Sequence, residues 1–511
     1  MSSTAPGTGQ DSAPGSAPGS APGSAIDTIA AIATAPGPGA VGIVRLSGRQ
    51  ALALAGALFR SSHPGFSALK PRHLHHGSLV DAAGRVLDEA LVAVMPGPGS
   101  FTGEDTAEFF CHGGPAVLRA VLEELLALGA RLARPGEFTL RAFLNGKLDL
   151  TQAEAVAETI AAPTRAALHL AQLKLSGALS RRIGTLRQAL EDLRARLCLA
   201  VDFPDEDMEC LPLPQLRQEA LQAAQGVERL LAGVERARAW REGVLAVLAG
   251  RVNAGKSSLL NALVGRRRAI VSATPGTTRD YLEEQLDLSG LLVRLVDTAG
   301  LRGPVGGPGG IGEEALGGTD MGDMGDAVDP VEAQGQDLSR EFMGRAEAVL
   351  YVLDASTPLH PVDRTALAGL APGRTLVVLN KSDLRASQDF CGEALDAARG
   401  LGLSCVRVSA KTGEGLEELC ARLREGLLGG RPGGRAEPDP DEVAPNARQA
   451  AVLRLARAEL VALADDAGAG LPYDILGVRL EAACRLLSEL TGEIAPEAVL
   501  QDIFSRFCIG K

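Results

Sequence analysis

The segment Val244–Leu263 reads VLAVLAGRVNAGKSSLLNAL, and it decides the fold of the central part of the chain. An apolar run, Val244–Ala249, leads directly into Gly250–Ser257 (GRVNAGKS), which matches the GxxxxGK[ST] pattern of a phosphate-binding loop that follows a strand. In such a loop the backbone N–H groups surround phosphate oxygens, Lys256 reaches the β and γ phosphates, and Ser257 supplies a hydroxyl to Mg²⁺. The pattern is weak on its own, so its meaning depends on the motifs that follow.

Further motifs follow in the order of a guanine-nucleotide site. Asp297–Gly300 (DTAG) ends the apolar run Leu291–Val296 and brings a carboxylate toward the metal. Asn380–Asp383 (NKSD) follows the run Thr375–Leu379, and the Asp383 carboxylate can accept two hydrogen bonds from guanine that adenine does not offer. The ordered set predicts a GTP-hydrolysing protein. The residues predicted to bind GTP are Asn253, Ala254, Gly255, Lys256, Ser257, Ser258, Ser272, Ala273, Thr274, Pro275, Gly276, Thr277, Thr278, Asp297, Thr298, Ala299, Gly300, Asn380, Lys381, Asp383, Ser409, Ala410 and Lys411.

Changes in pattern along the chain predict a multidomain protein of the α/β and α classes. Strand-like runs alternate with helical stretches around the phosphate-binding loop, which predicts βαβ units and a parallel sheet. The flanking stretches have the apolar spacing of helices, so we expect one helical domain that an α/β domain interrupts. The predicted parts are a disordered Ser/Ala/Pro/Gly leader at 1–24, an N-terminal α+β domain at 25–150, helical parts at 151–243 and 431–511, and an inserted Ras-like P-loop G domain at 244–430.

The composition is that of an ordinary globular protein, with 46% hydrophobic and 22% charged residues. No apolar run reaches the ~18–20 residues needed to span a bilayer, and the N-terminus lacks the features of a secretory signal. The 8 cysteines include no CxxC pair, which favours reduced thiols in a cytoplasmic protein. The net charge of -12 argues against indiscriminate coating of nucleic acid and is compatible with RNA docking on a local basic face.

The residues around DTAG do not supply the usual groups that speed GTP hydrolysis. The residue after this motif is Leu301, which cannot orient a water, and no arginine finger is identifiable, although such a group is worth ~10³–10⁵ in rate. Asn253 can place a carbonyl oxygen where a monovalent cation sits against the phosphates, and the loop 272–280 can close over that cation with further oxygens. Asn253 can equally be a loop residue that bonds its own backbone.

These motifs, together with PGTTRD, DTAGLR and the terminal Phe507–Lys511 (FCIGK), resemble the MnmE (TrmE) family of tRNA-modification GTPases. The resemblance extends over essentially the whole of 26–511. The GTPase motifs are shared with ribosome-assembly GTPases, whereas the N-terminal motifs and FCIGK are far more specific. The N-terminal segments that carry the resemblance are VGIVRLSG at 41–48, PGSFTGED at 98–105, GGP at 113–115, RPGEF at 134–138 and AFLNGKLD at 142–149.

The resemblance implies a folate-binding N-terminal domain that dimerises, and G domains of a homodimer that meet across the nucleotide. It implies potassium in the cation role, held by Asn253, Ser272, Thr274 and Thr277, and Mg²⁺ held by Ser257 and Thr278. It also implies a heterotetramer with an FAD-dependent MnmG (GidA) partner, which together modify the wobble uridine of certain tRNAs with an aminomethyl-type group at C5. The resemblance further implies that the one-carbon unit comes from a tetrahydrofolate derivative, in the 5-formyl or methylene form, at a site that maps onto Arg45, Glu108, Lys147 and Lys511.

Catalysis is assigned by the same resemblance to Lys256, Asn253 and a glutamate beyond DTAG. Val331–Gly335 (VEAQG) aligns with the family's VExxG pattern and nominates Glu332. A Gly/Asp/Met-rich insertion at 303–328 interrupts the switch region and leaves Glu313 and Glu314 as competitors. Cys508 has two interpretations, a reactive thiol near the folate or a small buried side chain.

Other functions compete with tRNA modification. A regulatory switch in ribosome assembly shares the GTPase motifs but has no need of a folate site. A folate-dependent aminomethyl transferase with a purely regulatory G domain is a third possibility. No membrane partner is expected.

Overall fold

The computed structural model describes residues 27–202, 211–267, 283–297, 342–384, 387–429 and 443–511. The chain forms two compact units. Unit 1 contains residues 1–149 and 496–511, and unit 2 contains residues 150–495. Among the described residues, no helix combines the length and the apolar character required to cross a membrane.

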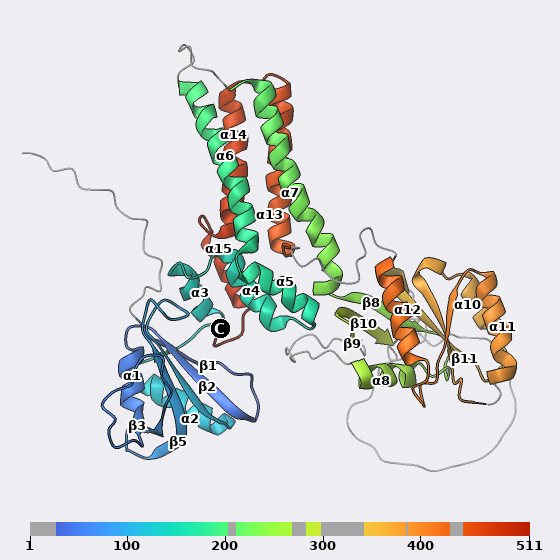
Figure 1. The fold of residues 1–511 in the computed structure, drawn as a ribbon, viewed down its shortest axis with the longest axis horizontal. Coiled ribbons are helices and arrows are strands. Elements are labelled where there is room, and N and C mark those ends of the chain that lie inside the picture. Colours follow the sequence, from blue (N-terminus) through green and yellow to red (C-terminus); the bar gives the residue numbers. More distant parts are fainter. Residues whose placement is uncertain (1–26, 203–210, 268–282, 298–341, 385–386, 430–442) are drawn as a thin grey trace, which may run out of the picture. The chain divides into compact units, whose positions relative to one another are not determined.

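Unit 1 is built on a seven-stranded sheet with the order β3-β4-β5-β6-β2-β1-β7 (Figure 1). Neighbouring strands are antiparallel, except that β1 and β7 are parallel. The elements are β1 (Ile29–Ile32), β2 (Gly39–Ser47), α1 (Ala51–Leu58), β3 (Phe59–Ser61), β4 (His75–Val80), β5 (Val86–Met95), β6 (Thr106–Gly113), α2 (Pro115–Ala127), β7 (Arg131–Leu132), α3 (Glu137–Leu144) and α15 (Glu497–Ser505).

Alternation along the strands gives the two faces of this sheet different roles. Val44 and Leu46 of β2 are fully buried in one core cluster with residues of α1 and α2. Because successive side chains of a strand point to opposite faces, Arg45 lies on the face away from α1 and α2. Arg45 is paired in register with Glu108 of β6. The sheet therefore presents two opposite charges side by side on the face that those helices leave uncovered.

The last residues of the chain pack within unit 1. The Phe138 N–H donates to the Lys511 carbonyl at 3.2 Å, and the Gly136 N–H donates to the Cys508 carbonyl at 3.5 Å. Gly510 has φ +93°, and a Cβ there would lie 2.5 Å from the carbonyl oxygen of Ile32. Only glycine combines this conformation with so close an approach, which gives the glycine of FCIGK a structural role.

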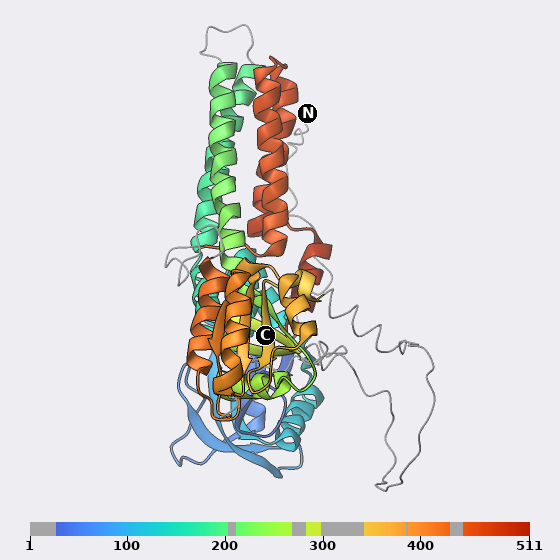
Figure 2. The same cartoon turned by 90° about the vertical axis from the view of Figure 1, so that its right-hand side faces the viewer.

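The helical part of unit 2 contains four long helices, α6, α7, α13 and α14, which lie side by side in both Figure 1 and Figure 2. The spacing of Leu186, Leu190, Leu193 and Leu197 predicted a helix, and the last three of these are buried among the four helices. The helices are α4 (Leu150–Ala161), α5 (Arg165–Leu175), α6 (Ala178–Asp202), α7 (Leu213–Arg241), α13 (Ala447–Gly468) and α14 (Tyr473–Thr491).

The α/β part of unit 2 holds a six-stranded sheet with the order β13-β12-β11-β8-β10-β9. The predicted parallel sheet is confirmed for five of these strands, and β9 alone runs antiparallel, against β10. Helices α8 and α12 pack on one face, and α10 and α11 on the other. The elements are β8 (Val244–Ala249), α8 (Lys256–Arg267), β9 (Glu283–Leu288), β10 (Leu291–Asp297), β11 (Ala348–Asp354), α10 (Pro361–Ala368), a 3₁₀ turn (Pro372–Arg374), β12 (Thr375–Asn380), α11 (Ser387–Gly400), β13 (Ser404–Arg407) and α12 (Leu416–Gly429).

The carboxyl ends of the parallel strands carry the predicted motif residues. β10 ends at Asp297 and β12 ends at Asn380, while the loop after β8 leads into α8 at Lys256. β12 is buried along its whole length, as expected for an inner strand of a parallel sheet. Ligands of open parallel sheets bind beyond these strand ends.

Candidate functional site

The phosphate-binding loop between β8 and α8 is folded around its lysine. The Lys256 ammonium donates to the carbonyl oxygens of Gly250 and Arg251, both at 2.8 Å, and the residue is 6% exposed. Asn253 has φ +66°, an uncommon conformation for a residue with a side chain. The loop thus places a cation at the N-terminus of a helix, an arrangement suited to phosphate.

Oxygen ligands for a divalent cation meet beside this loop. The Ser257 hydroxyl donates to the Asp297 carboxylate at 2.8 Å, and Asp297 is 1% exposed at the end of β10. A hydroxyl and a carboxylate oxygen are donors that Mg²⁺ prefers, so the residues present fit this metal. Bound there, the ion would neutralise phosphate charge during phosphoryl transfer.

Asn380 connects the phosphate-binding loop to the loop that contains Ser409, Ala410 and Lys411, here called the base-recognition loop. Its side-chain NH₂ group donates to the Ala254 carbonyl at 3.0 Å, and its side-chain oxygen accepts from the Ala410 N–H at 3.1 Å. Gly255 has φ +90°, and a Cβ there would lie 2.3 Å from the Asn380 amide nitrogen. The close approach therefore requires glycine at 255, which explains one fixed position of the GxxxxGK[ST] motif in physical terms.

The carboxylate predicted to read guanine is held from the neighbouring loop. The Ser409 hydroxyl donates to Asp383 at 2.7 Å and also accepts from the Thr412 N–H at 3.1 Å. Asp383 is exposed, whereas Ser409 is fully buried. Lys411 is exposed in the same loop, and Ser258 is exposed in the first turn of α8. A buried serine thus orients an accessible acceptor, which suits recognition of a ligand's donor edge.

Part of the predicted site lies outside the described residues. This holds for the loop nominated to bind potassium and nucleotide, for the end of the DTAG motif, and for the insertion with its competing glutamates. The residues concerned are Ser272, Ala273, Thr274, Pro275, Gly276, Thr277, Thr278, Thr298, Ala299, Gly300, Glu313, Glu314 and Glu332.

In unit 1 the predicted folate residues Arg45 and Glu108 bind each other. The Arg45 Nε donates to Glu108 at 2.7 Å, its Nη1 donates to the Gly510 carbonyl at 3.2 Å, and its guanidinium lies 5.7 Å from the centre of the Phe138 ring. Both side chains are about one-fifth exposed. An arginine can pair with a ligand carboxylate, and Glu108 can accept from a pterin donor edge, so the residues fit a folate.

The other predicted residues of this site approach from separate segments. The Lys147 ammonium donates to the Pro98 carbonyl at 3.0 Å, while the Lys511 carbonyl accepts from Phe138 of α3. Cys508 is exposed, so the interpretation as a small buried side chain does not describe it. Of the predicted residues, Arg45 thus contacts Glu108 directly, and it also contacts Gly510, the neighbour of Lys511.

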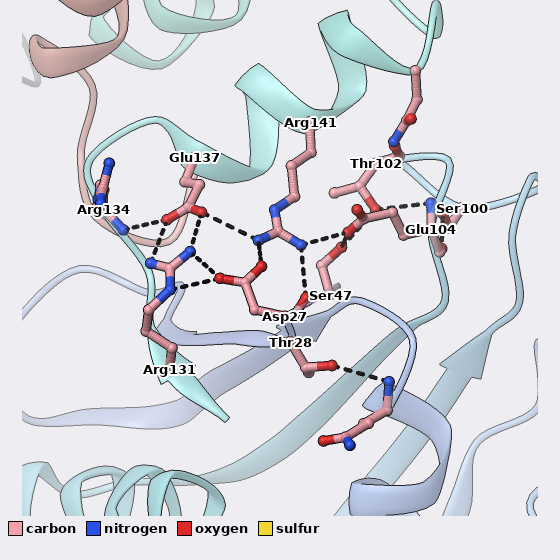
Figure 3. Close-up of polar contacts among 12 residues, drawn as sticks. Asp27, Thr28, Ser47, Ser100, Thr102, Glu104, Arg131, Arg134, Glu137 and Arg141 are labelled. Carbon is pink, nitrogen blue, oxygen red and sulfur yellow. Dashed lines mark hydrogen bonds and ion pairs between the residues drawn. The ribbon is translucent and has the colours of Figure 1, made fainter. Parts of the chain in front are cut away.

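Unit 1 also contains an ion-pair network that the sequence did not suggest (Figure 3). We call it the Arg141 network, and it consists of Asp27, Glu104, Arg131, Glu137 and Arg141. Arg141 is 7% exposed and pairs with Asp27 at 2.7 Å, Glu104 at 2.9 Å and Glu137 at 3.2 Å. Arg131 pairs with Asp27 at 2.7 Å and with Glu137 at 2.6 Å. Two guanidinium groups therefore share the same two carboxylates.

The Arg141 network reaches the strand that carries Arg45. The Ser47 hydroxyl donates to Glu104 at 2.7 Å and lies 2.8 Å from the Thr102 hydroxyl. Asn145 at the end of α3 donates to the Thr102 carbonyl at 2.7 Å. The network and these bonds tie α3, β2 and the loop before β6 together, and so position Arg45 and Phe138.

The charges of the network perturb its pKa values. Burial by itself raises the pKa of Glu137, but hydrogen bonds from Arg131 and the Arg134 N–H outweigh it and lower the pKa. Burial also acts to raise the pKa of Asp27, but hydrogen bonds from Arg131 and Arg141 outweigh it and lower this pKa. Burial lowers the pKa of Arg141, but Glu104 and Asp27 raise it overall. Asp27, Glu137 and Arg141 are thus held in their charged forms at neutral pH.

Two family profiles together match nearly all of the chain between residues 28 and 508. Residues 28–147 match the profile described as GTP-binding protein TrmE N-terminus, and residues 150–508 match the profile described as MnmE helical domain.

Relatives match over nearly their full length. The tRNA modification GTPase MnmE of Nitratidesulfovibrio vulgaris (strain DP4) is 49% identical over 485 residues, which cover 95% of this chain and 99% of that protein. The protein of the same name from Lawsonia intracellularis (strain PHE/MN1-00) is 42% identical, with 95% of this chain and 100% of that protein covered. Among solved structures, the G domain of the T. maritima FeoB iron transporter is 25% identical over 36% of this chain and 98% of that chain, with a TM-score of 0.24. The full-length relatives, rather than this structure, carry the comparison.

Proposed function

The chain belongs to the MnmE family of tRNA modification GTPases, as the motifs predicted, and we propose that it binds and hydrolyses GTP in the service of tRNA modification. The observation that carries the proposal is Asn380, whose amide joins the phosphate-binding loop at Ala254 to the base-recognition loop at Ala410. Because this contact joins the two loops, it supports the proposal that the phosphate and guanine groups belong to one site at the strand ends. It supports a single nucleotide site rather than separate coincidental loops.

The proposal gives the described residues the following roles in this reaction. Lys256 would neutralise the β and γ phosphates, and Ser257 would hold Mg²⁺ beside Asp297. Asp383, oriented by Ser409, would accept from guanine. Ligation of Mg²⁺ by Thr278, ligation of potassium by Asn253, Ser272, Thr274 and Thr277, and orientation of the attacking water by Glu332 complete the proposal. Potassium would supply the positive charge that an arginine finger provides elsewhere.

The family assignment supports a wider proposal about the assembly. A cytoplasmic homodimer would act with an FAD-dependent MnmG-like partner on the wobble uridine of certain tRNAs. A tetrahydrofolate derivative would bind near Arg45, Glu108, Lys147 and Lys511 and supply the one-carbon unit. The Arg45–Glu108 pair, which is about one-fifth exposed, supports this site, because it offers one cationic and one anionic group to a ligand that needs both.

Steady-state GTP turnover in potassium and in sodium, over a range of protein concentrations, tests the proposed mechanism. We expect turnover that requires potassium and rises per molecule as the GTP-bound protein dimerises. Equal turnover in both salts would contradict the cation role of Asn253, and Arg302 would then be the first substitute to test.

Nucleoside analysis of tRNA from cells that lack the gene tests the biological role. Loss of the C5-modified wobble uridine is expected, together with binding of a tetrahydrofolate derivative that depends on Arg45 and Lys147. Normal tRNA modification with defective ribosomal subunits, and no folate binding, would instead support the ribosome-assembly switch.

A further inference from the structure

Lys381 of the NKSD motif forms an ion pair that the nucleotide motifs do not include. Its ammonium lies 2.6 Å from Asp354, and the two side chains are 33% and 21% exposed. Asp354 is the last residue of β11 and belongs to none of the predicted motifs. The pair therefore joins the NKSD motif to the end of β11 and is partly shielded from solvent. A charge-assisted hydrogen bond is stronger there than on an open surface.

The fold fixes both ends of this pair. β11 and β12 are neighbouring parallel strands, and Asp354 lies in register with Asn380, the residue before Lys381. The Ala355 N–H donates to the backbone carbonyl of Asn380 at 2.9 Å, and this bond joins the residue after β11 to the last residue of β12. The second carboxylate oxygen of Asp354 accepts from the Ser356 N–H at 2.9 Å and from the Ser356 hydroxyl at 2.6 Å. Asp354 is therefore oriented by Ser356 as well as by Lys381.

The backbone of Lys381 indicates that its side chain has a defined place. Lys381 has φ +66°, in the left-handed region that side-chain-bearing residues rarely adopt and that glycine or asparagine adopts more easily. A conformation of this kind persists where the surroundings require it. Here the flanking Asn380 bonds two loops, Asp383 is held by Ser409, and Lys381 is held by Asp354. The side chains of Asn380, Lys381 and Asp383 thus each have a defined hydrogen-bond partner.

We propose that Asp354 is a positioning residue for guanine-nucleotide affinity, which acts by holding the Lys381 side chain in one conformation next to the base. The inference rests on the proposed GTP site. With its ammonium fixed at Asp354, the four-carbon stem of Lys381 is ordered before the nucleotide arrives. Binding then avoids the entropy cost of ordering a long side chain, which is the general benefit of a preorganised site.

The charge state of Asp354 agrees with this role. Burial acts to raise its pKa, but the hydrogen bonds from Lys381 and Ser356 outweigh burial and lower it. The carboxylate therefore remains ionised at neutral pH and below. Removal of its charge by substitution, rather than by acid, is the practical way to test it.

A double-mutant cycle on the full-length protein tests the inference, with fluorescent GDP as the probe. We expect Asp354→Asn to raise the Kd for GDP about tenfold while kcat at saturating GTP stays within about twofold, because Lys381 lies on the base side of the site. In a Lys381→Met background, Asp354→Asn should change the Kd no further, since the two residues act as a unit. Glu393→Gln, which breaks the exposed Arg364–Glu393 pair of the same domain, is the matched control and should leave the Kd unchanged.

Several results would overturn the inference. An unchanged Kd in Asp354→Asn would do so, as would an equal loss in both backgrounds, because Asp354 would then act independently of Lys381. An equal fall in kcat would place the effect at the phosphates instead. Asp354→Ser repeats the cycle if the asparagine variant does not fold. Absence of GDP binding by the wild type would overturn the proposed GTP site itself, an outcome distinct from failure of the Asp354 variants alone.

Discussion

The nucleotide site and the Arg45 site are assembled in different ways. At the nucleotide site, Asp297 and Asn380 end strands of one parallel sheet, and their partners lie on the adjacent loops. At the Arg45 site, the groups come from β2, β6 and the last residues of the chain, and the supporting Arg141 network extends from Asp27 to α3. The first site depends on sheet topology, whereas the second depends on long-range ion pairs.

This difference determines how each site responds to change. A strand end is held by the backbone hydrogen bonds of the whole sheet, so a side chain there can be replaced without loss of the fold. The Arg141 network is itself the connection between segments, and removal of one member takes an ion-pair partner from several partly buried charges at once. Substitutions at the first site should therefore reduce function with the fold intact, and substitutions in the network should loosen the fold locally.

The largest effect is expected for Lys256→Ala. Loss of the ammonium that lies inside the phosphate-binding loop should lower GTP turnover about 1000-fold, because a preorganised charge at the phosphates is removed. Thermal unfolding should change little. Turnover by purified variants measures the effect, and Arg364→Ala on the exposed pair with Glu393 is the control. Turnover within threefold of wild type would contradict a role for Lys256 at the phosphates.

Arg141→Met tests the ion-pair network that supports the Arg45 site. It removes the cation that Asp27, Glu104 and Glu137 share and leaves Arg131 to pair with Asp27 and Glu137 alone, so we expect a loss of ~3–5 kcal/mol in the local stability of β1 and α3. Hydrogen exchange of amides in these elements reads the loss directly. Arg85→Met is the matched control, because Arg85 is 82% exposed in its pair with Asp81 and such pairs contribute ~0–1 kcal/mol. Equal protection in both variants would show that the network does not hold the segments.

Arg45→Ala tests the proposed ligand of unit 1. Without the guanidinium, affinity for 5-formyltetrahydrofolate should fall about tenfold or more, since a charge-assisted bond to the ligand is lost. Calorimetric titration measures it, with Arg119→Ala on the exposed side of α2 as the control. If the two variants bind the folate equally well, Arg45 has no part in its recognition.

A smaller effect is expected from pH. The pKa values of Asp27 and Glu137 are lowered in the fold, so their contribution to stability is fully present above the unfolded values near ~4 and is lost as pH falls through the folded values. Protection of β1 and α3 should therefore weaken more steeply in acid in the wild type than in Arg141→Met. The same slope in both proteins would contradict coupling to the network.

The proposed nucleotide site could be nominated from sequence because its residues lie in short contiguous motifs after apolar runs, as with Gly250–Ser257 after Val244–Ala249. The antiparallel β9 and the packing of 496–511 within unit 1 were not predicted, since neither leaves a local pattern. The Arg141 network was missed for the same physical reason. Arg141 and Asp27 are 114 residues apart, and a charged residue in a sequence carries no sign of its distant partner. Asp354 was missed because it ends a strand without a motif of its own.

The most direct test of the guanine-nucleotide site is the equilibrium affinity of the full-length protein for GDP and for ADP. The carboxylate of Asp383, held by Ser409, should make GDP bind ~10⁴-fold more tightly than ADP, because adenine leaves that acceptor unpaired. Asp383→Ala should abolish most of this preference. Equal affinities for GDP and ADP in the wild type would contradict the assignment of a GTP site.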